Sequence, residues 1–365
     1  MKKAIITIAV IFVMAAIAGG LFFVSQVKSM EENMTNSEKT QEMVKKDTFE
    51  PVEYEATYKA TLDSDFYMLL LGVDKDADRE QSDEFAGDGF RSDTIILAHI
   101  NTDEKKVALC SMERDLMINL DGYGTCKLNN AYNVGGVVGI TKEVENMAGV
   151  DISHYAIVDM DGLAAIIDSV GGVEVDVEKP FYDDQMDDGI ETAGLQTLNG
   201  TKALVYARSR YPWENGDYDR ARHQRDVIRS LANKVMDGTN AFQKMSFLNK
   251  LSENIATDLT VEQLYELATK MEGIDMDTSM YSMMTPANST YVDEVSYQVL
   301  DEFAWNKMLE AFKNLEDPSE ILLNMENATS LESTNKELFD KLRGVDISPT
   351  ASSKSDAIAW SDVDD

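Results

Sequence analysis

The sequence predicts an α/β fold: a central mixed β-sheet flanked by helices on both faces, preceded by one N-terminal transmembrane helix. Three observations support this fold class. Residues 4–24 contain no charged side chain. Further along, continuous apolar runs have the length of buried strands, beginning with FYMLLLGV at residues 66–73. Longer segments with helical spacing alternate with these runs, as in sheets that helices cover on both sides.

The apolar run at residues 4–24 predicts a membrane anchor. It follows two lysines and spans 21 residues. As a helix it would be about 32 Å long, which is enough to cross the hydrocarbon core. Because lysines favour the cytoplasmic side, we expect residues 1–3 in the cytoplasm and the domain outside the cell membrane. A signal peptide cleaved at the Ala-Ile-Ala sequence of residues 16–18 is the alternative. The apolar run continues past that site to Val24, which favours the anchor.

Composition divides the rest of the chain into three segments. Residues 25–62 are polar and lack an apolar period, which is typical of a stalk. Residues 63–316 carry the α/β pattern and form the predicted catalytic domain. Residues 317–365 turn polar again, and we expect a partly disordered tail there.

Five strands and five helices are predicted within the domain. The strands lie at residues 66–73, 94–100, 106–111, 155–158 and 173–177. Residues 101–104 have turn composition, so the second and third strands should form a hairpin. The helices lie at residues 129–148, 162–170, 219–236, 241–250 and 261–271, and a Gly-Gly pair follows the second of them.

Composition and missing motifs exclude several function classes. The 365-residue chain carries a net charge of −33, so its own field opposes nucleic-acid phosphates, and we expect no nucleic-acid partner. The sequence contains no GxxxxGK[ST] phosphate loop, GxSxG elbow or HExxH zinc motif. Its three histidines share no metal-ligand spacing. Cys110 and Cys126 form either a disulfide or two separate buried thiols.

Arginine is unusually concentrated in one part of this acidic chain. Of its ten arginines, six fall between residues 208 and 229. A guanidinium group is always charged and binds two phosphate oxygens at once, so this concentration indicates an anion site. The alternative is a helix stabilised by ion pairs. We expect ion pairs for Arg222 and Arg229, and substrate contacts for Arg208, Arg210 and Arg220.

A second group of charged residues lies at the ends of predicted strands. Asp74 follows the first strand, Arg91 and Asp93 precede the second, and Arg114 follows the third. Strand ends of α/β sheets are common ligand sites. Two carboxylates with substrate phosphate oxygens would suit Mg²⁺, whereas a single aspartate at a strand end is often only a cap or turn residue.

These segments together resemble the LytR-CpsA-Psr family of cell-wall enzymes. The resemblance runs from residue 70 to residue 225 and includes LLGVD at 70–74, FRSDT at 90–94, MERD at 112–115, KLNNAY at 127–132, HYAIVD at 154–159, VGGVEV at 170–175, LNGTKALVYARSR at 198–210 and DRARHQR at 219–225. The single N-terminal anchor also fits that family.

The resemblance implies a Mg²⁺-dependent phosphotransferase that moves a glycopolymer, such as teichoic acid or capsule polysaccharide, from undecaprenyl pyrophosphate to the 6-hydroxyl of N-acetylmuramic acid in peptidoglycan. It also implies an apolar pocket for the polyprenyl chain. By position in the matching motifs, the resemblance implies that Asp74 and Asp93 bind the metal. It implies catalytic roles for Arg91, Asp93, Arg114, Arg208 and Arg210. It implies that the substrate is bound by Lys127, Asn129, Arg220 and Gln224.

One position departs from the family pattern, and other functions remain open. The residue before the Arg-Asp pair is usually proline, and here it is Glu113. The same residues would serve a polyprenyl-pyrophosphate pyrophosphatase, or a non-catalytic binder of the lipid or of peptidoglycan. A membrane-bound transcriptional attenuator is a further alternative, which the net charge and the expected topology oppose.

Overall fold

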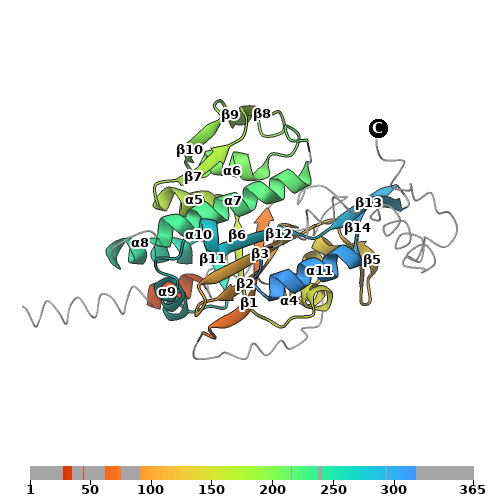
Figure 1. The fold of residues 1–365 in the computed structure, drawn as a ribbon, viewed down its shortest axis with the longest axis horizontal. Helices are drawn as coiled ribbons and strands as arrows, with labels where there is room; N and C mark the ends of the chain where they lie inside the picture. The colour runs from red at the N-terminus through yellow and green to blue at the C-terminus, as the bar shows by residue number, and fades with distance from the viewer. Residues whose placement is uncertain are drawn as a thin grey trace, which may run out of the picture.

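The computed structural model describes residues 28–34, 44, 62–74, 91–214, 216–236, 241–292 and 294–317. The predicted anchor at residues 4–24 and nearly all of the predicted tail lie outside these residues. Within the described part of the chain, no helix is both long enough and apolar enough to span a membrane. Figure 1 shows the arrangement of the elements.

A six-stranded mixed sheet forms the centre of the domain, as the sequence predicts. Its strand order is β11-β6-β1-β2-β3-β12. β1, β2 and β3 form an antiparallel meander, β6 and β12 run parallel to β1 and β3, and β11 runs antiparallel to β6. The bounds are β1 (Asp65–Asp74), β2 (Arg91–Asn101), β3 (Lys106–Met112), β6 (Ile152–Asp159), β11 (Ile255–Thr257) and β12 (Met280–Met284).

Helices cover both faces of this sheet, because apolar residues of the strands alternate between two cores. Leu69 and Leu97 face one core with α4 (Leu128–Ala148) and α11 (Glu302–Lys313). Met68 and Ile96 face the other core, together with side chains of α7 (Asp217–Met236) and α9 (Val261–Lys270). Figure 1 shows α4 and α11 on the opposite side of the sheet from α7.

A third core joins α7 to a small β region and fixes the segment that carries several arginines. The elements are α5 (Met160–Ser169), β7 (Val173–Val177), β8 (Phe181–Asp183), β9 (Asp188–Ile190), β10 (Gly194–Leu198) and α6 (Gly200–Arg208). Here the His223 ring lies 4.2 Å from the Tyr206 ring and 4.4 Å from the Trp213 ring, measured between centroids. Burial lowers the pKa of His223 to about 4, so the ring is neutral at pH 7.

The predicted strands and helices are present, and the prediction missed several shorter elements. The missed elements are α6, α11, β8–β12 and the outlying pairs β4 (Met117–Leu120) with β5 (Gly124–Lys127) and β13 (Ala287–Val292) with β14 (Val295–Leu300). The remaining helices are α8 (Ala241–Ser252), which was predicted, and α10 (Met276–Ser279), which was not. Cys110 and Cys126 are both buried free thiols, so the disulfide alternative was wrong.

Candidate functional site

The predicted site residues meet at one edge of the central sheet. β1, β3 and β6 run in the same direction and end at this edge, and β2 begins there. Asp74 pairs with Arg91 in the backbone register. On the other side of β2, Ile95 pairs with Met112, so Asp93 and Arg114 each lie two residues farther toward the same edge. The strand order therefore brings together segments that are far apart in the sequence.

A β-bulge sets the position of Asp93. Gly72 pairs with Thr94 and Val73 pairs with Ser92, so Asp93 is an extra residue in β2. Such bulges bend a strand and redirect a side chain, and they are frequent beside active sites. A Cβ atom at Gly72 would lie 2.9 Å from Cβ of Thr94, so a glycine permits this close approach of the two strands.

Asp93 and Arg114 form the closest charged pair of the site. Oδ1 of Asp93 lies 2.6 Å from Nη1 of Arg114. Asp115 lies 3.9 Å from Nε of Arg114 and 3.1 Å from Nζ of Lys127. Burial lowers the pKa of Arg114, but Asp93 and Asp115 more than compensate and leave this pKa raised. Both predicted cations, Arg114 and Lys127, are therefore held in this cluster by acidic residues.

Asp217 at the start of α7 holds two further arginines. Its Oδ1 lies 2.9 Å from Nε of Arg210, and its Oδ2 accepts a hydrogen bond of 2.9 Å from Nη2 of Arg220. Nη2 of Arg220 also donates to the backbone carbonyl of Asp93, at 3.4 Å. Burial is the main reason that the pKa of Arg220 is lowered. Nε of Arg220 and Nε of Arg114 are buried and donate no hydrogen bond to any of the described residues, so each keeps a donor for an anion that reaches it.

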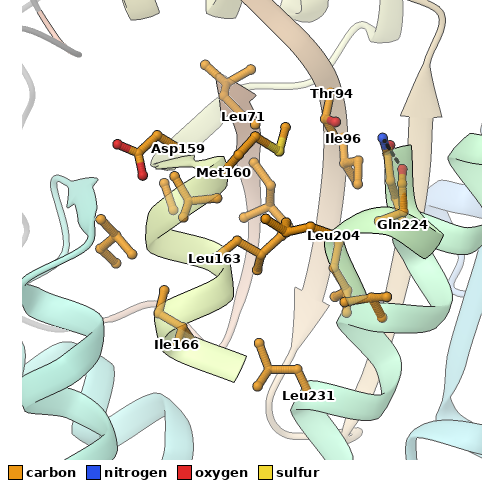
Figure 2. A pocket seen from close by; sticks show the side chains of 18 of the residues that line it. Leu71, Thr94, Ile96, Asp159, Met160, Leu163, Ile166, Leu204, Gln224 and Leu231 are labelled. Carbon is orange, nitrogen blue, oxygen red and sulfur yellow. Dashed lines mark hydrogen bonds between the residues drawn. The ribbon is translucent and has the colours of Figure 1, made fainter. Parts of the chain in front are cut away.

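An apolar cavity of about 270 Å³ lies beside this cluster and runs along α7, and Thr94, the neighbour of Asp93, lines it. Gln224 and Arg208 line it near the sheet edge, and Leu231 lines it seven residues farther along α7, or roughly 10 Å at 1.5 Å per residue. Figure 2 shows Gln224 beside Thr94, and Leu163 and Leu204 from α5 and α6 facing the same space. The other lining residues are Leu70, Leu71, Gly72, Ile96, Ala156, Val158, Asp159, Met160, Ile166, Ala207, Val227, Ile228, Leu251, Ile255 and Leu264.

Other predicted residues have defined but different positions. Nε2 of Gln224 donates to the carbonyl of Ala207 at 3.3 Å, which orients its amide beside the cavity. The backbone N–H of Asn129 donates to the carbonyl of Arg114 at 3.0 Å, and its side-chain Oδ1 is buried without a hydrogen bond. The backbones of Asp74 and Arg91 lie at the sheet edge, and their side chains lie outside the described structure.

The arginines expected to form ion pairs do so. Arg222 contacts Glu178 and lies 3.3 Å from Asp219, and Arg229 lies 3.3 Å from Asp226. These side chains line a separate, polar cavity on the β7 side of α7. They are therefore separated by the helix from the apolar cavity, and the predicted ion pairs of Arg222 and Arg229 are confirmed. Arg210 and Arg220 pair with Asp217 as well, so ion pairing alone does not divide the arginines into two groups.

Three acidic residues of the site were given no role by sequence reasoning. Asp217 was not singled out, although its i,i+3 spacing to Arg220 is visible in the sequence. Asp159 caps α5 by accepting a hydrogen bond from Gly162 and also lines the cavity. Glu113 is 2% exposed, and its Oε1 has no hydrogen-bond partner in the part of the chain that the structure describes. Burial, followed by Asp217, raises the pKa of Glu113 to about 7.

An apolar cavity with an arginine and a glutamine at one end, close to a cluster of further arginines, is typical of proteins that bind an amphiphile with an anionic head group. The chain belongs to the LytR_cpsA_psr family, whose model matches residues 21–314. This match confirms the family resemblance found in the motifs.

Curated relatives in this family are named as transferases or regulators. The chain is 32% identical over 270 residues to the polyisoprenyl-teichoic acid–peptidoglycan teichoic acid transferase TagU of Enterococcus faecalis. The aligned residues cover 73% of this chain and 86% of that protein. It is 29% identical over 306 residues to Biofilm regulatory protein A of Streptococcus mutans, which covers 80% and 72%.

Solved structures share the fold. The crystal structure of TagV from B. subtilis has a TM-score of 0.61 and 25% identity, covering 70% of this chain and 98% of that one. The structure of TagT bound to LIIa-WTA has a TM-score of 0.58 and 22% identity, covering 72% and 95%. At that identity, the second likeness concerns the fold alone.

Proposed function

We propose that this chain transfers a glycopolymer from undecaprenyl pyrophosphate to the 6-hydroxyl of N-acetylmuramic acid in peptidoglycan and forms a phosphodiester. The observation that carries this proposal is that the apolar cavity is lined by Arg208 and by Thr94, the neighbour of Asp93, whose backbone carbonyl accepts a hydrogen bond from Arg220. A polyprenyl chain needs an apolar site, and the attached pyrophosphate needs cations at the end of that site. The name of the TagU relative describes the same type of transfer.

In the proposed reaction, the acceptor hydroxyl oxygen attacks the phosphorus that carries the glycopolymer. The bond from this phosphorus to the bridging oxygen breaks, and polyprenyl phosphate leaves with the electron pair. The hydroxyl proton passes to a carboxylate or to solvent. Arg114, Arg210 and Arg220 stabilise the charge that grows on the phosphate oxygens, and Arg208 and Gln224 hold the donor where the cavity begins.

The proposal includes a Mg²⁺ ion bound by Asp74 and Asp93. Aspartate oxygens are the hard ligands that Mg²⁺ prefers, and one or two of them with phosphate oxygens suffice. The backbone pairing of Asp74 with Arg91, two residues before Asp93, agrees with a shared site. No group of three or more His, Cys, Asp or Glu side chains suited to a metal occurs in the described residues. When bound, the ion would offset the negative charge of the phosphates.

The test uses the full chain in detergent with a polyprenyl-pyrophosphate-linked glycan, Mg²⁺ and peptidoglycan. Released polyprenyl phosphate and glycan attached to peptidoglycan are measured separately. We expect both in equal amounts, loss of both with a chelator, and at least a 100-fold lower rate for Asp93→Ala, by analogy with removal of other charge-stabilising groups. Asp121→Ala, at an exposed turn, is the matched control and should retain full activity.

Each alternative function gives a different result in this assay. Release that needs no acceptor would indicate a pyrophosphatase. Donor binding without release, even with the acceptor present, would indicate a non-catalytic binder. If the chain neither binds the donor nor releases polyprenyl phosphate, the proposal is refuted. The function of a transcriptional attenuator would then be the one to test.

A further inference from the structure

The short helix at residues 28–34 packs on the domain at the end of the apolar cavity that lies away from the arginines. Met30 and Met34 are each 1% exposed and form a core with Leu248 of α8 and Val261 of α9. Leu251 and Leu264 pack against this core. The same two leucines also line the cavity. The helix is therefore separated from the cavity by a single layer of side chains, and Figure 1 shows it, in red, beside α9.

The cavity has a polar end and an apolar end, and α7 defines its direction. Arg220 and Gln224 lie toward the start of α7, near the sheet edge. Ile228 and Leu231 follow along the same helix, and Leu251 and Leu264 line the cavity beside them. A donor bound with its pyrophosphate at the arginines would direct its hydrocarbon chain toward α8 and α9.

The sequence places this helix next to the predicted anchor. Only three residues separate Val24, the last residue of the apolar run, from Lys28. An extended chain covers at most about 3.6 Å per residue, so the helix begins within roughly 14 Å of the end of that run. Lys28 is exposed, with a side-chain accessibility of 76%. Because Met30 and Met34 attach the helix to α8 and α9, a membrane anchor at residues 4–24 would hold this end of the domain near the bilayer.

On the basis of the proposed function, we infer that residues 28–34 hold the apolar end of the cavity against the bilayer, so that the polyprenyl chain of the donor passes directly from the membrane between α8 and α9. The net charge of −33 makes such a device necessary, because the domain's own field opposes adsorption to anionic lipids. The polar end of the cavity then faces away from the bilayer, toward the side where a wall acceptor arrives.

The experiment measures capture of a polyprenyl phosphate with a photoreactive group at the far end of its chain. The probe is presented to the full chain either in lipid vesicles or in detergent. Met30→Glu combined with Met34→Glu should separate the helix from α8 and α9, because burying two carboxylates there is unfavourable. The matched control, Lys28→Gln with Ser29→Glu, makes the same change of two charge units on the exposed side of the helix.

A second variant leaves every packed residue unchanged. A flexible Gly-Ser linker of about 20 residues, with an average span of roughly 25 Å, is inserted after Val24. We expect both the double-Glu variant and the linker variant to capture the probe from vesicles about tenfold less than the parent chain. In detergent, all variants should capture it equally, with cross-links to the peptides that contain Leu251 or Leu264.

The outcomes separate this inference from the proposed function. Equal capture from vesicles by all variants would overturn the inference, as would an equal loss in detergent, which would indicate damage to the cavity itself. If the parent chain captures the probe in this pattern but never cleaves a pyrophosphate donor, the membrane placement stands and the proposed transfer fails.

Discussion

Asp93 and Arg114 lie side by side at the edge of the central sheet, with Oδ1 of Asp93 2.6 Å from Nη1 of Arg114. The bulge in β2 supplies the aspartate, and the end of β3 supplies the arginine. A phosphate group that reaches Arg114 competes with this carboxylate for the same guanidinium. On the proposed function, the pair orients the arginine before the substrate arrives, and the displaced carboxylate becomes available to a cation.

Replacing Arg114 with lysine tests whether a guanidinium group is needed. The variant keeps the positive charge beside Asp93 but loses the planar pair of donors that suits a phosphate. We expect the rate of polyprenyl phosphate release to fall about 100-fold, or roughly 2.7 kcal/mol in barrier. The matched control is Arg229→Lys, at an arginine paired with Asp226 on the other side of α7, which should change the rate less than twofold. Equal rates for the two variants would contradict a role for Arg114 in catalysis.

Asp217 should act by positioning Arg210 and Arg220. Asp217→Ala removes the one carboxylate that lies 2.9 Å from both arginines. The two guanidinium groups would then repel each other and lose their alignment, so we expect the KM for the donor to rise about tenfold. Asp217→Asn should recover part of the loss, since an amide oxygen can still accept a hydrogen bond. Steady-state kinetics with both variants checks this expectation, and an unchanged KM for the alanine variant would disprove it.

The central strands were predicted well because buried strands have continuous apolar sequences. The runs at 66–73 and 106–111 match β1 and β3 to within one residue at each end. The helical spacing after Asp219 also located most of α7. Short, half-exposed pairs such as β13 and β14 lack a comparable run and were missed.

The sequence singled out several cations that the structure brings together, namely Arg114, Lys127, Arg210 and Arg220, and their roles stay a prediction. The division of the arginines followed from the motifs, and Arg222 and Arg229 form the expected ion pairs. The link between Asp217 and Arg210, the bulge at Asp93 and the cavity all depend on contacts between distant segments. Local sequence spacing cannot reveal such contacts, although the i,i+3 spacing of Asp217 to Arg220 could have pointed to one of its two arginine partners.

Filling the apolar cavity should discriminate between donors by chain length. Leu204→Trp places a larger side chain in a cavity of about 270 Å³ and leaves the arginines in place. We expect the KM for a long polyprenyl donor to rise at least tenfold, because overpacking excludes the chain, while a short-chain donor is used as before. Leu195→Trp is the matched control, since Leu195 is 69% exposed on β10. A similar loss with both donors would show that the cavity does not hold the lipid chain.

Glu113 should make the stability of the domain depend on pH. Its carboxyl is buried, and its pKa rises from 4.5 to about 7, mainly because burial disfavours the charged form. Between these two values the folded chain keeps a proton that the unfolded chain has lost. The free energy of unfolding should therefore fall as pH rises from 4.5 to 7 and remain at the lower level above 7. The contribution is at most about 3.4 kcal/mol, from 1.36 kcal/mol for each of the 2.5 units of pKa.

Glu113→Gln removes this dependence because glutamine stays neutral at every pH in the range. We expect the variant to be more stable than the parent chain at pH 8, by about 1–3 kcal/mol, and similar to it at pH 4.5. Urea unfolding at the two pH values measures the difference. Glu191→Gln, at an exposed carboxyl, should follow the parent chain at both. If Glu113→Gln loses stability at pH 8, the buried carboxylate instead has a favourable partner in Arg114 or Arg220, and its ionised form belongs to the charge cluster of the site.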